Sequence, residues 1–354
     1  MELSTPKFDP KKILIILHGS LGDVTRALPL ADSVRKGFPR AFVAWSIEPA
    51  ALPLLQDNRA IDEIIVFERQ RGWRAFGPFL AQIRVRKFDL VLDLQRHLKS
   101  GLISWCSGAR HRIGFNRADA KEMNWIFNNL HLERFGNQIS KLDHYLKFAE
   151  YLGVPQQPVD WNFALSTAEQ ASVNHCLADV NQPFAVLFIG TRWESKQWFP
   201  VQIARSAELL RGEYRFAVVL LGGKEDQDLA AAVVTEARVP VVNLVGRTSL
   251  REAIGVIERA SLAIGPDTGL MHIAAAVRTP VISLWGATDP QRTGPYGFAD
   301  LIIQGRAPCV PCNRRTCNIG RVCMKSITSA EIAAKIATAV GLESTNEGRY
   351  AERI

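Results

Sequence analysis

Short runs of apolar residues alternate with longer amphipathic stretches along the chain. The first half holds four such runs, Lys12–Leu17, Phe42–Trp45, Ile64–Phe67 and Leu90–Leu94. Continuous apolar runs of this length are typical of central strands in a parallel sheet, because helices cover both faces of such a sheet. The stretches between the runs, such as Ala31–Phe38 and Phe79–Arg86, indicate helices. The pattern therefore predicts alternating strands and helices around a parallel sheet.

The second half repeats this alternation. Its predicted strands are Ala185–Ile189, Phe216–Leu221, Val241–Leu244, Ala260–Ile264 and Pro280–Trp285. Between the halves, Gly153–Pro158 is rich in turn-forming and polar residues, which predicts the start of a linker. Near the end, Thr328 and Glu331 have the spacing of a capping box. They predict a last helix that ends near Gly341 and a polar tail after it.

The chain is thus predicted to be an α/β protein with two doubly wound, parallel-sheet domains facing a cleft. The first domain is expected to span residues 1–160 and the second 161–328, with a closing helix and tail at 329–354. A length of 354 residues is sufficient for two separate cores. Ligands of such sheets bind beyond the carboxyl ends of the strands, and the polar motifs that follow all lie at such ends.

The segment from Gly265 to His272 joins the predicted strand Ala260–Ile264 to a helix. Its Gly-Pro turn is followed by Asp267, Thr268 and Gly269, which would begin the helix. Free backbone N–H groups at a helix N-terminus suit a phosphate or diphosphate. His272 returns to the helix face of Thr268 four residues later. The alternative is an ordinary strand–helix turn with a cap and a buried histidine.

Two glycines and an acid, Gly19, Gly22 and Asp23, follow the first predicted strand. The glycines allow a tight turn and close approach of a ligand, but their spacing is not that of the dinucleotide fingerprint. Asp23 is predicted to be either the N-cap of the next helix or a general base that removes a proton from a hydroxyl.

Comparable turns follow two strands of the second half. Thr191 offers a hydroxyl donor and Lys196 a compact charge with three donors, both suited to phosphate oxygens. Lys196 could equally extend along an apolar surface into solvent. Glu225 follows the next strand, where a carboxylate can accept hydrogen bonds from ribose hydroxyls or cap a helix.

The formal net charge is +8, and residues 1–160 carry most of it, with 23 Lys and Arg against 17 Asp and Glu. Such a surplus favours a polyanionic partner, although scattered arginines are usually just solvated. No nucleic-acid-binding motif accompanies the charge, so nucleic acid is not expected. There is no apolar run of membrane-spanning length, and Met1–Lys7 lacks the apolar core of a signal peptide, so a cytoplasmic location is expected.

Four cysteines, Cys309, Cys312, Cys317 and Cys323, lie within fifteen residues. In a reducing cytoplasm such a cluster favours a metal site over disulfides, and four thiolates satisfy tetrahedral zinc. Reduced thiols without metal, a structural zinc, an iron–sulfur cluster and disulfides all stay open. If a metal binds here, it is expected to be structural and separate from catalysis.

Taken together, the motifs resemble glycosyltransferase family 9, the ADP-heptose:lipopolysaccharide heptosyltransferases. The resemblance covers nearly the whole chain. It rests on these segments: Gly19–Asp23, Leu28-Pro29, Asp93–Gln95, Lys99-Ser100, Arg112–Phe115, Gly190-Thr191, Lys196, Trp198, Gly265–Gly269, His272 and Leu284–Pro290. Each segment alone is weak, whereas their order and spacing are specific.

The resemblance implies a GT-B fold of two Rossmann-like domains, with the acceptor bound by the first and the nucleotide-sugar by the second. Asp23 matches the catalytic base of the family. The implied donor-binding residues are Thr191, Lys196, Glu225, Asp267, Thr268, Gly269 and His272. The implied acceptor-binding residues are Arg69, Arg71, Asp93, Gln95, Arg96, Lys99 and Arg112, which would face a phosphorylated lipopolysaccharide core.

The expected reaction is an inverting single displacement that moves a heptose from ADP-heptose to the inner core. No cofactor is expected for catalysis, because Lys196 and the N–H groups at Thr268 and Gly269 can stabilise the leaving diphosphate. Peripheral binding to an anionic membrane, on the cytoplasmic face of the inner membrane, is also expected. The alternatives are a transferase of the same fold with another nucleotide-sugar, a nucleotide-sugar epimerase, and a non-catalytic binding protein. The acceptor type, I, II or III, stays open.

Overall fold

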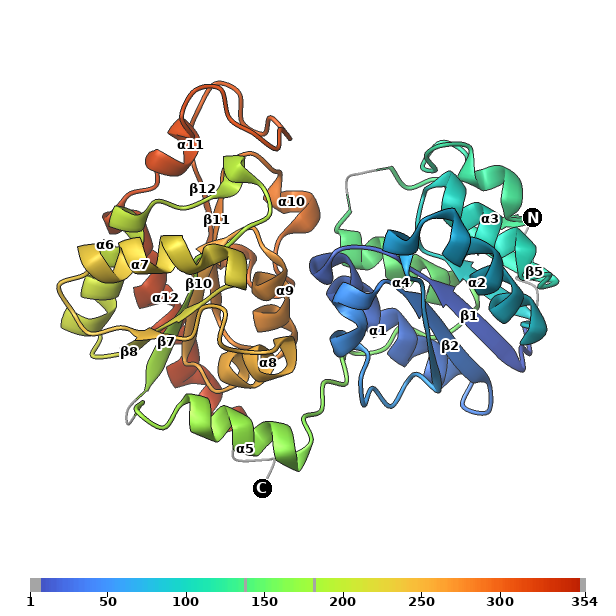
Figure 1. Ribbon diagram of the computed structural model, residues 1–354, viewed down its shortest axis with the longest axis horizontal. Helices are drawn as coiled ribbons and strands as arrows, with labels where there is room; N and C mark the ends of the chain where they lie inside the picture. The colour runs from blue at the N-terminus through green and yellow to red at the C-terminus, as the bar shows by residue number, and fades with distance from the viewer. Residues whose placement is uncertain (1–7, 137–138, 181–182, 351–354) are drawn as a thin grey trace. The chain divides into compact units, whose positions relative to one another are not determined.

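The computed structural model describes residues 8–136, 139–180 and 183–350. The start of the chain up to residue 7 and the end of the tail, residues 351–354, lie outside the described residues, and so do the expectations about them. The chain divides into two compact units, Met1–Ala164 (unit 1) and Leu165–Ile354 (unit 2), and each is a sheet with helices on its faces (Figure 1).

Unit 1 is built on one six-stranded sheet in the order β3-β2-β1-β4-β5-β6, and every neighbouring pair is parallel. Its strands are β1 (Lys12–Ile16), β2 (Phe42–Ile47), β3 (Glu63–Val66), β4 (Leu90–Asp93), β5 (His111–Gly114) and β6 (Leu130–His131). Its helices are α1 (Leu21–Gly37), η1 (Pro49–Leu54), η2 (Arg69–Arg71), α2 (Trp73–Val85), α3 (Leu98–Cys106), η3 (Asn124–Phe127) and α4 (Lys141–Tyr151).

Unit 2 has the same architecture, with the strand order β12-β11-β10-β7-β8-β9. Its strands are β7 (Phe184–Phe188), β8 (Ala217–Leu221), β9 (Val242–Asn243), β10 (Leu262–Pro266), β11 (Val281–Trp285) and β12 (Ile302–Gln304). Its helices are α5 (Thr167–Cys176), η4 (Glu194–Lys196), α6 (Pro200–Gly212), η5 (Lys224–Asp226), α7 (Gln227–Glu236), α8 (Leu250–Glu258), α9 (Gly269–Ala276), α10 (Pro290–Thr293), η6 (Ala299–Leu301), α11 (Val322–Lys325) and α12 (Ser329–Tyr350).

Burial explains why the central strands are apolar along their whole length. Ile13, Leu14, Ile15 and Ile16 of β1 are completely buried, as are all residues of β7 apart from a small exposed part of Phe184. Both strands have a parallel neighbour on each side and helices above and below, so no face of either strand meets water. The predicted pair of parallel α/β sheets is confirmed.

Two details differ from the expectations. The last helix begins at the predicted capping box, where Glu331 N–H donates to Thr328 Oγ1 at 3.2 Å and Thr328 N–H donates to the Glu331 carboxylate at 2.8 Å. However, α12 continues to Tyr350 instead of ending near Gly341. The division between the units falls after Ala164, a few residues beyond the expected boundary, since Trp161 donates its indole N–H to the Thr25 carbonyl of α1 at 2.9 Å.

The strand order reverses beside the first strand of each unit. In unit 1 the chain leaves β1 for β2 and β3 on one side, and β4, β5 and β6 then lie on the other. In unit 2 the reversal lies between β7 and β10. The loops that follow the two central strands run to opposite faces of the sheet at such a point, which opens a crevice at its carboxyl edge.

The approach of β10 to β7 depends on a glycine and gives a first prediction. A Cβ atom on Gly265 would lie 2.6 Å from Phe188 Cβ and 2.7 Å from the Phe188 carbonyl oxygen. Gly265→Ala should therefore lower the free energy of unfolding by about 1–3 kcal/mol, because the backbone of β7 must shift. Gly212→Ala is the matched control, since a Cβ atom on Gly212 would have no neighbour within 4 Å. Urea unfolding of both variants tests this, and equal losses would contradict it.

Candidate functional site

Asp23 lies at the carboxyl edge of the unit 1 sheet, in the first turn of α1. Ser20 is the N-cap of that helix, and its Oγ accepts from the Asp23 N–H at 3.3 Å. The Asp23 carboxylate in turn accepts from the Ser20 N–H at 3.2 Å and from Ser20 Oγ at 2.9 Å. The alternative prediction, that Asp23 is itself the N-cap, is wrong: it is the third helical residue and completes a capping box.

Two cations hold the other oxygen of Asp23. Arg26 Nη2 lies 2.9 Å from Asp23 Oδ1, and Lys141 Nζ, at the start of α4, pairs with the same oxygen. Burial would raise the pKa of the Asp23 carboxyl, but the charges of Lys141 and Arg26 outweigh it and hold that pKa far below its usual range. Asp23 is therefore ionised at every physiological pH. Neither cation was among the predicted site residues.

An aromatic and basic cluster lies at the ends of β1 and β3. The ring of His18 is stacked on Phe67 with 5.0 Å between centroids, and its Nε2 lies 2.7 Å from Ser46 Oγ. Lys99 Nζ lies 3.9 Å from the centroid of the Phe67 ring. Burial, together with the charges of Lys99 and Arg69, lowers the pKa of His18 to about 3. His18 is thus a neutral imidazole at neutral pH, with the charges of Lys99 and Arg69 acting on it.

The predicted acceptor-binding residues fall into separate groups. Arg69 lies 3.7 Å from Glu48, and Arg71 pairs with Glu68 at 2.6 Å; both arginines are exposed and belong to η2. Arg96 Nη2 lies 2.8 Å from His144 Nδ1, and its guanidinium covers the Phe115 ring at 4.4 Å. Gln95, beside it, is half-buried and follows β4.

Asp93, at the last position of β4, has no exposed surface. Asn124 donates to its carboxylate at 2.7 Å and Asn128 at 3.2 Å, while the Gln95 N–H donates to its other oxygen at 3.2 Å. Burial raises the pKa of Asp93 to about 6, although these hydrogen bonds oppose the shift. Such a carboxyl joins β4 to the chain around η3 and does not itself present an oxygen to an acceptor.

Arg112 also differs from the expectation. It is in β5, and its guanidinium donates to the carbonyls of Ala109 at 2.7 Å and Phe127 at 3.0 Å. Ala109 precedes β5 and Phe127 precedes β6, so the side chain faces the edge at which these strands begin. This direction argues against contact with an acceptor at the carboxyl edge.

In unit 2, Asp267 connects the loops that follow three strands. Its carboxylate lies 2.5 Å from Lys196 Nζ, which follows β7, and accepts from Thr288 Oγ1 at 2.7 Å, which follows β11. Its carbonyl accepts from Thr191 Oγ1 at 3.3 Å. Lys196 also lies 4.3 Å from the centroid of the Trp193 ring. The structure thus brings together Thr191, Lys196 and Asp267 as predicted from the sequence, and adds Thr288 and Trp193.

Helix α9 begins directly after Asp267. Thr268 is its N-cap, and no side-chain cap bond occupies the first N–H groups of the helix. Backbone N–H groups in this position bind anions through hydrogen bonds and the helix dipole. His272 lies one turn further along and is almost completely buried. The ammonium of Lys196, the hydroxyls of Thr191 and Thr288 and the first N–H groups of α9 therefore lie together at the carboxyl edge of the sheet. The sequence predicts an anion site at this place.

The acids after β8 divide their roles. Glu225 is exposed, whereas Asp226 accepts from the Gly223 N–H at 2.8 Å and closes a capping box. The Asp226 carboxylate also fills the space beside Gly190, where a Cβ would lie 1.8 Å from its Oδ2. Asp226 is therefore the structural acid of this turn, whereas the side chain of Glu225 is exposed.

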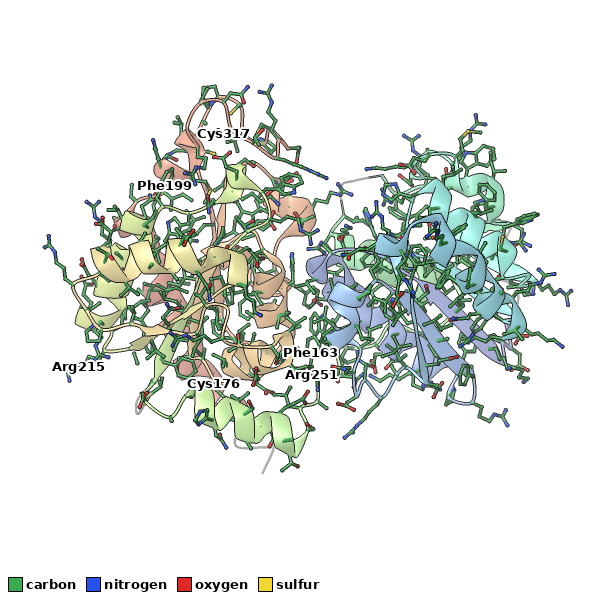
Figure 2. The ribbon with its side chains drawn as sticks, viewed as in Figure 1. Phe163, Cys176, Phe199, Arg215, Arg251 and Cys317 are labelled. Carbon is green, nitrogen blue, oxygen red and sulfur yellow. The ribbon has the colours of Figure 1, made fainter. Side chains whose placement is uncertain are left out.

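The cysteine-rich segment packs on the loop that carries Lys196. Ser195 donates to the carbonyl of Arg314 at 2.5 Å and to that of Arg315 at 3.1 Å, and the Cys317 N–H donates to the Glu194 carboxylate at 2.8 Å. Figure 2 labels Cys317 and Phe199, whose ring lies under the Arg321 guanidinium at 4.1 Å. The segment is therefore in direct contact with the loop that carries Lys196, which its sequence does not indicate.

The thiols of Cys309, Cys312 and Cys317 lie close enough to Cys323 to affect its pKa. Burial raises the pKa of Cys323, and negative charge on Cys309, Cys312 or Cys317 would raise it further. Among the residues that the structure describes, no group of three or more His, Cys, Asp or Glu side chains is placed to hold a metal ion. The predicted zinc site finds no support in this arrangement.

A surface groove of unit 1, of about 1060 Å³, lies elsewhere. Lys11, Asp89 and Arg110 line it, and they precede β1, β4 and β5. It therefore opens at the edge where the strands begin, whereas ligands of doubly wound sheets bind at the opposite edge. The groove is therefore separate from the groups at the carboxyl edge.

Fold and site together define a class: a protein of two doubly wound units, the second with an ammonium, hydroxyls and helix N-terminal N–H groups gathered around Asp267 at the carboxyl edge of its sheet. Residues 78–323 match the model of Glycosyltransferase family 9 (heptosyltransferase). The chain belongs to this family and is a glycosyltransferase.

Individual relatives agree with this assignment. The chain is 25% identical to the lipopolysaccharide core heptosyltransferase OpsX of Haemophilus influenzae, over 83% of this chain and 84% of the relative. It is 27% identical to lipopolysaccharide heptosyltransferase 1 of Pseudomonas aeruginosa, over 86% and 87%. The solved structure of Escherichia coli ADP-heptose lps heptosyltransferase II has the same fold, with a TM-score of 0.77, 20% identity and coverage of 94% and 99%. The GT-B fold is confirmed.

Of the helices in the described ranges, none combines the length and the apolar character that crossing a bilayer requires.

The buried His18 gives a prediction about pH. Its pKa is about 3 in the folded protein and ordinarily 6.5, so between these values only the unfolded chain binds the proton. Protonation then favours unfolding, and His18 lowers the free energy of unfolding by up to about 1.4 kcal/mol per pH unit as the pH falls below 6.5. Asp93 acts in the opposite direction below pH 6, because its folded pKa is raised.

The contribution of His18 is measured by comparing the free energies of unfolding of wild type and His18→Gln at each pH. We expect the free energy of unfolding of the variant to fall less steeply between pH 6.5 and 5. His97→Gln is the control in the same unit, since His97 is exposed and lies 3.1 Å from Glu122. Chemical unfolding followed across this range measures both slopes, and parallel profiles for wild type and His18→Gln would contradict the prediction.

Proposed function

We propose that the protein transfers a heptose from ADP-heptose to the lipopolysaccharide inner core, with inversion at the anomeric carbon. The observation that carries this proposal is the convergence of Lys196, Thr191 and the N-terminus of α9 around Asp267. An ammonium and free N–H groups at one point stabilise the negative charge that grows on a leaving diphosphate. The named relatives, which are lipopolysaccharide heptosyltransferases, support the choice of sugar and acceptor.

Unit 2 would then bind the donor, with Glu225 accepting from the ribose and with the buried His272 lying in α9, the helix whose N-terminus carries the N–H donors. Unit 1 would bind a phosphorylated acceptor. Arg69, Arg71, Arg96 and Lys99 lie on the loops and helices that follow β3 and β4, and their charges suit phosphate groups. The same surplus of positive charge suits the anionic surface of a membrane, on the cytoplasmic face of the inner membrane.

In the proposed mechanism, Asp23 removes the proton of the acceptor hydroxyl as its oxygen attacks the anomeric carbon. The bond from that carbon to the diphosphate breaks, and ADP leaves with the electron pair. Lys196 and the N–H groups at Thr268 and Gly269 meet the developing charge, so catalysis is proposed to need no cofactor.

The decisive experiment measures ADP release and product formation with ADP-heptose and a panel of truncated lipopolysaccharide acceptors of types I, II and III. Acceptor-dependent release of ADP supports the proposal. Turnover only with another nucleotide-sugar favours a different transferase of this fold, and release of UDP without any acceptor favours an epimerase.

The assignment of Asp23 gives a prediction. Asp23→Asn should lower turnover by at least a hundredfold, the lower end of the roughly 10²–10⁴ that a positioned general base contributes, while ADP binding is kept. Asp143→Asn is the matched control, because Asp143 has the same position in the capping of α4, where its carboxylate accepts from Ser140 at 2.7 Å. Steady-state kinetics test this, and near-wild-type turnover in folded Asp23→Asn would contradict the assignment of Asp23 as the general base.

The donor site gives another. Lys196→Ala should weaken ADP binding by about 10–150-fold, because a hydrogen bond to a charged group contributes about 1.5–3 kcal/mol. It also leaves the Asp267 carboxylate facing the diphosphate without its ammonium. Lys335→Ala, on α12, serves as the control. Isothermal titration calorimetry with ADP measures the affinities, and equal values for wild type and Lys196→Ala would place this lysine outside the donor site.

A further inference from the structure

In the free protein, the hydrogen bonds of Asp23 conflict with its proposed role as a general base. A carboxylate has about four lone-pair positions. Four donors already point at Asp23: the Ser20 N–H and Oγ at Oδ2, and Arg26 and Lys141 at Oδ1. A hydroxyl that is to be deprotonated must replace one of these donors. The question is which of them can leave.

Three of the donors are fixed by the local structure. Both Ser20 groups belong to the capping box that begins α1, so their loss would destabilise the first turn. Arg26 is one turn along the same helix at i, i+3, and its side chain is only 10% exposed. Lys141 differs, because it comes from the first position of α4 and its side chain is 25% exposed. It is the donor that can swing away on its flexible stem.

We propose that Lys141 couples binding of the acceptor to release of the base. In the free enzyme its ammonium holds Asp23 Oδ1, and on acceptor binding it moves to an anionic group of the acceptor, so that Oδ1 accepts the acceptor hydroxyl. The O–H bond then breaks, its proton passes to Oδ1, and the oxygen forms the bond to the anomeric carbon while ADP leaves. The inference rests on the proposed function and adds what switches the base on.

The exchange of partners would change the basicity of Asp23. Arg26, on its own helix, and Lys141, on the adjacent helix α4, are the cations that face it, and the acid nearest to Lys141 along α4, Asp143, is bonded to Ser140. While both cations are in place, the carboxylate is a weak base, because an acceptor of low pKa receives protons poorly. Departure of one cation raises the pKa of Asp23 toward its ordinary range. An acceptor without an anionic group would bind without producing this change.

The wild-type enzyme provides the first test. The pH dependence of kcat/KM reports the base in the free enzyme, and that of kcat reports it in the complex with substrates. With saturating ADP-heptose and a deacylated lipopolysaccharide-core acceptor, we expect the acidic limb of kcat to lie at higher pH than that of kcat/KM. Coincident acidic limbs would overturn the proposal.

Variants provide the second test. Lys141→Met should raise the KM for the intact acceptor by about 10–150-fold, the range for a lost charge-assisted hydrogen bond, and should not lower kcat. On the same acceptor after phosphatase treatment, or after esterification of its carboxylates, Lys141→Met should match or exceed the kcat/KM of wild type, because its base is already free. Whichever treatment abolishes the difference identifies the group that Lys141 meets. Lys141→Arg should restore a low KM.

Lys147→Met is the control on the same helix, since Lys147 pairs with Glu150 at 2.6 Å. If Lys141→Met lowers kcat/KM by one factor on every acceptor, Lys141 only ties α4 to α1 and the inference fails. The failure of the proposed function is distinguishable, because Asp23→Asn would then keep its turnover. A loss of activity in Asp23→Asn with no acceptor-dependent change in Lys141→Met overturns the inference alone.

Discussion

The reversal of strand order beside the first strand of each sheet is the constraint on which the rest of the structure depends. All strands are parallel, so every loop that follows a strand reaches the same edge. Beside β1 and β7 the loops diverge to opposite faces, and polar groups there are not forced into the apolar core. Asp23 follows β1, and Lys196 and Asp267 follow the two strands at the reversal in unit 2. These three charged residues therefore lie where the strand order leaves space at the edge of each sheet.

Both sites are built on a carboxylate that is partly withdrawn from water and paired with lysine. The side chains of Asp23 and Asp267 are 20% and 12% exposed. Removing charges from water costs several kcal/mol, so such a pair adds little to stability, whereas breaking it is expensive unless a new partner replaces the old one. An anionic ligand is such a partner. A lysine in such a pair would therefore leave its carboxylate only for a ligand that brings its own negative charge.

Some of this could be predicted from the sequence, and the reason is burial. Strands covered on both faces, such as β1 and β7, are continuous apolar runs and can be recognised as such, whereas β6 and β12, with two and three residues at the sheet edges, carry no such signal. Thr191, Lys196 and Asp267 follow strands, so their meeting follows from strand order. Lys141 lies 118 positions after Asp23 and meets it only because α4 packs beside α1. The burial of Asp93 and the direction of Arg112 likewise depend on packing.

The cysteine-rich segment shows how packing can change the meaning of a motif. Four cysteines at close spacing suggest an independent metal centre, yet the contacts of the segment are with Glu194 and Ser195, the residues that precede Lys196. Glu194 is held twice, by the Cys317 N–H and by Arg321 at 3.2 Å. Since η4 is a single short turn, it has few internal hydrogen bonds to fix the direction of Lys196. The position of the ammonium therefore depends on contacts with a segment more than a hundred residues further along the chain.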